Sequence, residues 1–128
     1  MGLSPKPFVP EIPEIPEFTG VEMELLWENA SPTSSFAAQT ISLDLSVYDL
    51  VMLEFTASTT WYIRQVFISN IGGNFYYRVV DGAGKVYNRT CVINRNGIQF
   101  EVGQEGTSRN NDLCLPTKIY GVKGVQTA

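Results

Sequence analysis

The sequence predicts an all-β protein, an antiparallel and jelly-roll-like β-sandwich of about eight strands that follows an extended, proline-rich N-terminal arm. Three observations predict this fold. Most of the chain alternates apolar and polar residues with a period of two. Turn signals rich in glycine and asparagine recur every eight to twelve residues. No segment has a helical period, and a chain of 128 residues suits one domain with its own core.

The arm, residues 1–20, is defined by its prolines, because five of the seven lie in its first 16 residues. From Pro10 to Glu17 the order proline, glutamate, isoleucine repeats with a period of three, which matches the turn of polyproline II. A stiff spacer and a docking arm both fit this pattern. In the second case the docking side chains form an apolar ridge with its flanking prolines. They are Phe8, Pro10, Ile12, Pro13, Ile15, Pro16 and Phe18.

Residues 21–128 form the predicted domain. Val21, Met23, Leu25 and Trp27 alternate with mostly acidic residues, which predicts a half-buried strand over residues 21–28. The run 50–55 is apolar except for Glu54 and predicts a strand buried on both faces or in a sandwich core. The other strands are expected over residues 41–46, 60–69, 74–80, 85–93, 98–102 and 113–122, the last interrupted near Pro116.

The charges and reactive side chains exclude several classes of function. Residues 1–28 hold six of the 13 acids and one of the nine bases, so the acidity belongs to the arm and the first strand. The other eight bases are spread along the chain without forming a cluster, so the sequence predicts no nucleic-acid partner. No apolar run is long enough to span a membrane. The chain has no histidine, and Cys91 and Cys114 are too far apart for a CxxC motif. We therefore expect no enzyme, catalytic residue, metal site or cofactor. A hydrolase built on an Asp/Glu pair remains the alternative.

The two cysteines are better explained as small buried apolar residues than as a disulfide. Trp27, Phe55, Phe67 and Phe100 lie on apolar alternations and are expected in the core.

Adjacent aromatic residues predict a surface for recognition. Neighbouring strand residues point to opposite faces, so at least one residue in each aromatic run should point away from the core. Exposed tyrosine and tryptophan suit a subunit interface or a sugar-stacking surface, and we favour the interface. The candidates are Trp61, Tyr62, Tyr76 and Tyr77.

Three segments carry a family resemblance. The stretch 27–41, with the run Ser-Pro-Thr-Ser-Ser-Phe-Ala-Ala-Gln at 31–39, is followed by 43–49 and by the ending 118–123. Together they resemble a domain found at the C-terminal ends of tail and minor structural proteins of phages and prophages of Gram-positive bacteria. The resemblance covers about residues 21–124. It implies a β-domain at the periphery of a virion, often trimeric, with host attachment as its usual proposed role, and it implies no catalytic residue.

The chain differs from those domains because they end longer proteins, whereas it begins at Met1 with a short arm. A complete small virion protein, such as a head-decoration or head-fibre protein, fits equally well. We expect a virion structural protein that forms a homo-oligomer, a trimer by the resemblance, and binds another virion protein through its arm. The alternative is an adhesin domain that binds bacterial cell-wall glycans.

Overall fold

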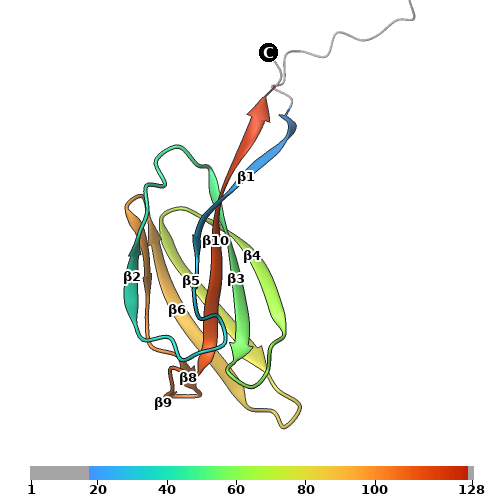
Figure 1. Ribbon diagram of the computed structural model, residues 1–128, viewed down its shortest axis with the longest axis vertical. Coiled ribbons are helices and arrows are strands. Elements are labelled where there is room, and N and C mark those ends of the chain that lie inside the picture. The colour runs from blue at the N-terminus through green and yellow to red at the C-terminus, as the bar shows by residue number, and fades with distance from the viewer. Residues whose placement is uncertain (1–17, 127–128) are drawn as a thin grey trace, which may run out of the picture.

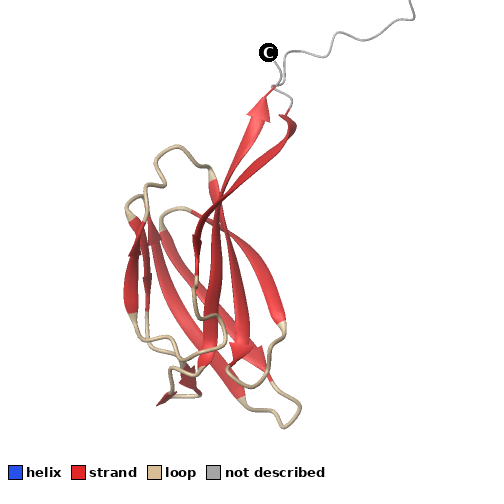
Figure 2. Ribbon diagram, viewed as in Figure 1, coloured by secondary structure: helices blue, strands red, loops and turns tan. Residues whose placement is uncertain are grey.

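The computed structural model describes residues 18–126, and within them the side chains of residues 20–124. These residues form two antiparallel sheets and no helix, so the predicted β-sandwich is confirmed (Figures 1 and 2). The ten strands are β1 (Phe18–Glu28), β2 (Gln39–Ser42), β3 (Leu50–Ser58), β4 (Arg64–Asn70), β5 (Gly73–Val80), β6 (Val86–Asn94), β7 (Gly97–Phe100), β8 (Gln104–Glu105), β9 (Ser108–Arg109) and β10 (Leu113–Gln126).

Sheet A has the strand order β1-β10-β3-β4, and each pair is antiparallel. In sheet B, β6 is central. It pairs along its length with β5, and its other edge pairs with β7 and then with β8. Strand β2 extends the sheet beyond β7, and β9 pairs with β8. Strands β1 and β4 are therefore the edges of sheet A, and β5 is an edge of sheet B.

The core lies between the inner faces of the two sheets. Phe55 of sheet A stacks on Tyr77 of sheet B, with ring centroids 4.4 Å apart. Phe67 and Phe100 meet the Phe55 ring edge-on. Phe55 and Phe100 are buried, while Phe67 and Trp27 are partly buried against the core, which confirms the core predicted from the aromatic alternation. Aromatic contacts between the sheets therefore hold the sandwich together.

Strand β1 differs from its prediction because of one bulge. Leu25 pairs with Tyr120 and Trp27 pairs with Ile119, so Leu26 is an extra residue with no partner. A bulge of one residue reverses which face the alternating side chains occupy. Trp27 therefore packs on the core, whereas Met23 and Leu25 lie on the outer face and are 53% and 50% exposed. The prediction that the apolar side of this strand is buried was therefore wrong for Val21, Met23 and Leu25, which precede the bulge.

The outer end of β1 forms a ribbon with β10. Pairing of these two strands extends from Glu28–Lys118 to Phe18–Gln126, whereas β3 pairs with β10 only as far as Leu50–Val122. The last part of β1 and β10 therefore projects beyond the sandwich as two strands (Figure 1). The strand begins at Phe18, earlier than the expected residue 21.

Other boundaries also differ from prediction. The strand expected over residues 60–69 begins at Arg64, so Trp61 and Tyr62 lie in the loop before it. The expected second strand ends at Ser42, and the loop after it buries Leu45 fully. Strand β10 continues through Pro116 where an interruption was expected. A register shift between Pro116 and Lys118 accommodates the missing N–H, as bulges do for proline in a sheet.

Candidate functional site

The described residues offer no metal cluster of histidine, cysteine, aspartate and glutamate side chains. Within the same range, no helix has the length and apolar character needed to cross a bilayer. Several carboxylates stabilise local structure instead. Asp81 accepts hydrogen bonds from the Lys85 N–H at 2.9 Å and the Tyr87 hydroxyl at 2.8 Å, and these bonds lower its pKa. Glu54 accepts a 2.7 Å bond from the Thr117 hydroxyl.

The arm positions named from the sequence lie mostly outside the described residues. This applies to Phe8, Pro10, Ile12, Pro13, Ile15 and Pro16. Phe18 was assigned to the arm by composition, but its backbone is the first of β1 and pairs with Gln126. The arm therefore enters the fold directly through a paired strand.

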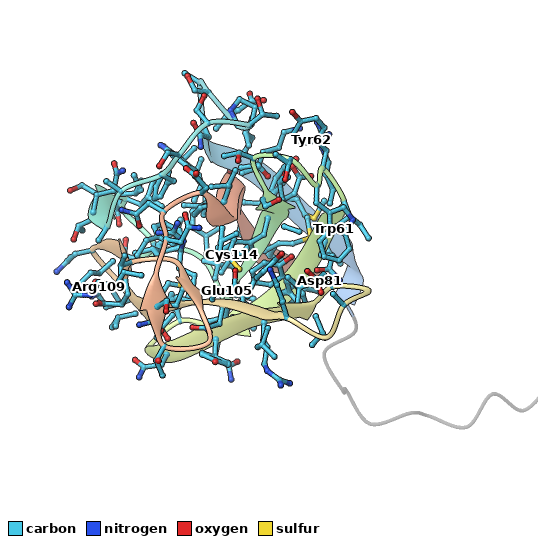
Figure 3. All side chains as sticks on the ribbon, turned by 90° about the horizontal axis from the view of Figure 1, so that it is seen from below. Trp61, Tyr62, Asp81, Glu105, Arg109 and Cys114 are labelled. Carbon is cyan, nitrogen blue, oxygen red and sulfur yellow. The ribbon has the colours of Figure 1, made fainter. Side chains whose placement is uncertain are left out.

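Trp61 and Tyr62 lie in the loop between β3 and β4, at the end of the sandwich away from the ribbon (Figures 1 and 3). Tyr62 is 61% exposed. Trp61 is partly buried and meets the Tyr87 ring edge-on, with centroids 6.5 Å apart. Of these two residues, Tyr62 therefore offers the largely free ring.

Tyr76 and Tyr77 of β5 point to opposite faces of sheet B, as the alternation rule predicted. Tyr76 is 54% exposed on the outer face. Tyr77 is fully buried, stacks on Phe55, and donates a 2.6 Å hydrogen bond to the Gln65 side chain. The prediction of Tyr77 as an interface or sugar-stacking residue was therefore wrong. The four predicted aromatic residues do not form one surface.

Both cysteines are free and buried, which confirms the prediction of small apolar residues. Burial raises the pKa of Cys91 and of Cys114 to about 12. Arg89 is also fully buried, and it donates to the carbonyl oxygens of Leu113, Cys114 and Glu101. Burial lowers the pKa of Arg89 to about 10, so it remains charged at neutral pH. These groups are inaccessible to a ligand and serve the fold.

The largest candidate surface is the outer face of sheet A. Residues paired across adjacent strands share a face. Leu25 pairs with Tyr120, Tyr120 with Met52, and Met52 with Ile68, so this row crosses all four strands. We call the following set the apolar face: Val21, Met23, Leu25, Leu50, Met52, Val66, Ile68, Tyr120 and Val122.

The exposure of the apolar face is high for a folded domain. Val21 is 65% exposed, Ile68 is 62% exposed and Val66 is 50% exposed. At the centre of the sheet Leu50 and Met52 are half-buried and Val122 is buried. Contiguous apolar surface of this kind marks interaction sites, whereas single exposed apolar residues are ordinary.

The outer face of sheet B has a different composition. Paired rows there combine Tyr76 with Thr90 and Arg78 with Asn88. Val80 is the large aliphatic residue most exposed on β5, at 47%. The two outer faces of one sandwich therefore differ, and only that of sheet A is apolar across its strands.

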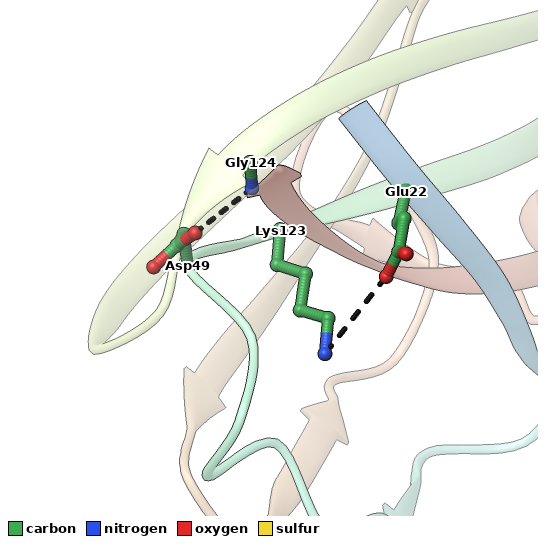
Figure 4. A network of polar contacts seen from close by, with 4 residues as sticks. All are labelled: Glu22, Asp49, Lys123 and Gly124. Carbon is green, nitrogen blue, oxygen red and sulfur yellow. Dashed lines mark hydrogen bonds and ion pairs between the residues drawn. The ribbon is translucent and has the colours of Figure 1, made fainter. Parts of the chain in front are cut away.

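A hollow adjoins the apolar face where the ribbon leaves the body. It has a volume of about 470 Å³ and is lined by Gly20, Val21, Asp49, Leu50, Val122, Lys123 and Gly124. Asp49 is the sole carboxylate in this lining, and it accepts a 3.1 Å hydrogen bond from the Gly124 N–H. The Nζ of Lys123 lies 3.9 Å from Oε2 of Glu22 on the paired strand of the ribbon (Figure 4). The Asp49 bond therefore links the ribbon to the loop before β3, whereas the Lys123–Glu22 pair joins the two strands of the ribbon.

Comparison with protein-family models, with curated proteins and with solved structures finds no match to this chain. The function is therefore argued from the geometry above.

Sequence reasoning missed the apolar face, although part of its signal was visible. The largely apolar run at 50–55 predicted a strand buried on both faces or in a sandwich core. In β4 the apolar residues Val66 and Ile68 flank Phe67, so both faces of that strand carry apolar side chains. The bulge at Leu26 had no sequence signal, and it turns the β1 side chains outward.

Proposed function

We propose that the protein is a non-enzymatic structural protein of a phage virion, which is anchored by its arm and displays the β-sandwich as a homo-oligomer. Its role is in assembly or host attachment, and a tail, fibre or head-decoration position all fit. The observation that carries this proposal is the ribbon of β1 and β10. It joins the arm to one end of the sandwich, while the loop with Tyr62 lies at the opposite end.

The ribbon suits a connection that transmits a pulling force from the arm to the sandwich. Residues 18–28 are hydrogen-bonded along β10, and β10 is itself bonded to β3 in the middle of sheet A. A pull on the arm along β1 would load many of these bonds together instead of opening them one at a time. An N-terminal strand bound into a sheet in this way is also tied down against fraying.

Incorporation into particles tests the anchor. Full-length chain and a chain lacking residues 1–17 are each produced during particle assembly, and purified particles are probed for both. We expect the full chain in the particles and at least a tenfold loss of the shortened chain. A double substitution, Ile12→Glu with Ile15→Glu, should reproduce the loss, and Glu11→Gln with Glu14→Gln is the matched control. Equal incorporation of full and shortened chains would contradict the proposal.

A glycan-binding role is the second candidate, and the exposed Tyr62 ring beside Trp61 at the distal end favours it. Aromatic rings in such positions can stack on sugars. Binding of the full chain to purified bacterial cell wall tests it. We expect Tyr62→Ala to reduce binding severalfold and Tyr76→Ala, a similarly exposed tyrosine on sheet B, to leave it unchanged. No binding by the parent chain would remove this candidate.

A further inference from the structure

The apolar face has a specific occupant. We infer that it is the interface through which further copies of this chain assemble. The inference deepens the oligomeric part of the proposed function and rests on it. It places the contact on the outer face of sheet A, away from the aromatic residues that the sequence suggested.

The sequence of sheet A is that of a sheet covered on both faces. In β3, Val51 and Leu53 point into the core while Leu50 and Met52 point outward. In β4 the outward positions include Val66 and Ile68. A sheet with one solvated face normally carries polar residues on that face. Within residues 20–124 Val66 and Ile68 remain 50% and 62% exposed, so we assign their cover to another molecule.

The size of the face is sufficient for the centre of an interface. Its four strands lie ~4.8 Å apart and its apolar rows extend over roughly 20 Å, which gives a flat footprint on the order of 400 Å². A standard interface buries about 800 Å² on each partner, with an apolar centre and a polar rim. The hollow beside Val21 and Leu50 gives one end of the face a socket for an apolar side chain.

The rim favours a second copy as the partner. Glu28 pairs with Lys118, and Lys118 pairs with Glu54, so a row of alternating charge borders the apolar rows. Such a row is complementary to itself, because Lys118 of one copy can lie opposite Glu28 or Glu54 of another. A nucleic acid or an anionic membrane would require an excess of bases. The arm is a poorer partner for this rim. Its glutamates Glu11, Glu14 and Glu17 would lie against a rim that already holds two acids, Glu28 and Glu54.

Mass in solution tests the interface with the full-length chain. We expect light scattering to give two or three times the single-chain mass of 14.2 kDa, two for a twofold pair and three for a trimer. Val66→Lys combined with Ile68→Lys should reduce the mass to one chain, because both substitutions place charge on exposed positions of an edge strand. Val80→Lys is the matched control, since Val80 has nearly the same exposure on an edge strand of the opposite sheet.

Circular dichroism and thermal unfolding check that each variant folds, and Leu25→Lys provides an independent variant on the other edge strand. A two-chain mass that the same variants reduce to one chain would support the interface with a twofold pair. The inferred interface would be overturned if Val80→Lys also reduced the oligomer to a single-chain mass, or if only removal of residues 1–17 did so. A parent chain that is monomeric at millimolar concentration would also overturn it.

Failure of the interface and failure of the anchor are separable, because solution mass reports on the face and particle incorporation reports on the arm.

Discussion

The Arg89 guanidinium donates a 2.7 Å hydrogen bond from Nε to the carbonyl oxygen of Cys114. Cys114 has a φ of 54°, which makes it the sole non-glycine residue with a positive φ in the described chain. Its neighbour Leu113 receives a second bond from the same side chain, at 2.9 Å. A buried cation from sheet B therefore holds a strained turn of backbone at the start of β10.

Arg89→Met should destabilise the fold strongly. Three carbonyl oxygens would lose their donor, and each unsatisfied buried group costs about 1–3 kcal/mol, so we expect a loss of about 3 kcal/mol or more. Chemical denaturation measures the change. Arg78→Met, on the exposed outer face of sheet B, is the control and should change stability by less than about 0.5 kcal/mol. Similar losses for both variants would contradict the role assigned to Arg89.

Tyr77→Phe should cost about 1 kcal/mol, because it removes the hydroxyl that donates to Gln65 and preserves the ring stacked on Phe55. Tyr76→Phe is the matched control one residue away, on the solvent side of the same strand. We expect it to have no measurable effect on the free energy of unfolding. An equal effect of the two substitutions would contradict a specific stabilising role for the Tyr77–Gln65 hydrogen bond.

The buried thiols should make stability depend on alkaline pH. Cys91 and Cys114 have a pKa raised from 9.0 to about 12, so the unfolded chain releases these protons at lower pH than the folded chain does. Their stabilising contribution is complete below pH 9 and is lost as the pH rises towards 12.

We therefore expect the free energy of unfolding to fall between pH 8 and pH 10.5 more in the parent than in a variant with both cysteines changed to alanine. An aromatic disulfide reagent should also leave the folded thiols unmodified at pH 8 and modify both in denaturant. Rapid modification of the native protein would show that the thiols are accessible.

Gly121→Ala should destabilise sheet A, because an added Cβ would lie 2.6 Å from ring atoms of the buried Tyr48. Overpacking of this kind costs about 1–3 kcal/mol. Gly82→Ala is the control, since nothing lies within 4 Å of its Cβ position and the turn is exposed. A melting temperature that falls for Gly121→Ala but not for Gly82→Ala is the expected result. Equal melting temperatures would mean that the Tyr48 ring moves aside freely.

Much of this fold could be predicted because its signals are local. Alternation, apolar runs and segments rich in β-branched and aromatic residues identified eight strands. Glycine and asparagine turns placed the connections between residues 70 and 97 correctly within a few positions. The short strands β8 and β9 lie in a segment predicted as a polar loop. Two-residue strands carry too little alternation to be distinguished from a loop.

The sequence by itself determined an all-β sandwich, the aromatic core around Phe55 and the buried state of the two cysteines, since these follow from periodicity and apolar content. Only the tertiary structure decided which apolar side chains remain outside. The extra residue Leu26 reverses the faces of β1, and the strand order β1-β10-β3-β4 brings apolar side chains from four strands onto one surface. Bulges and strand order arise from long-range pairing, so no local pattern specifies them.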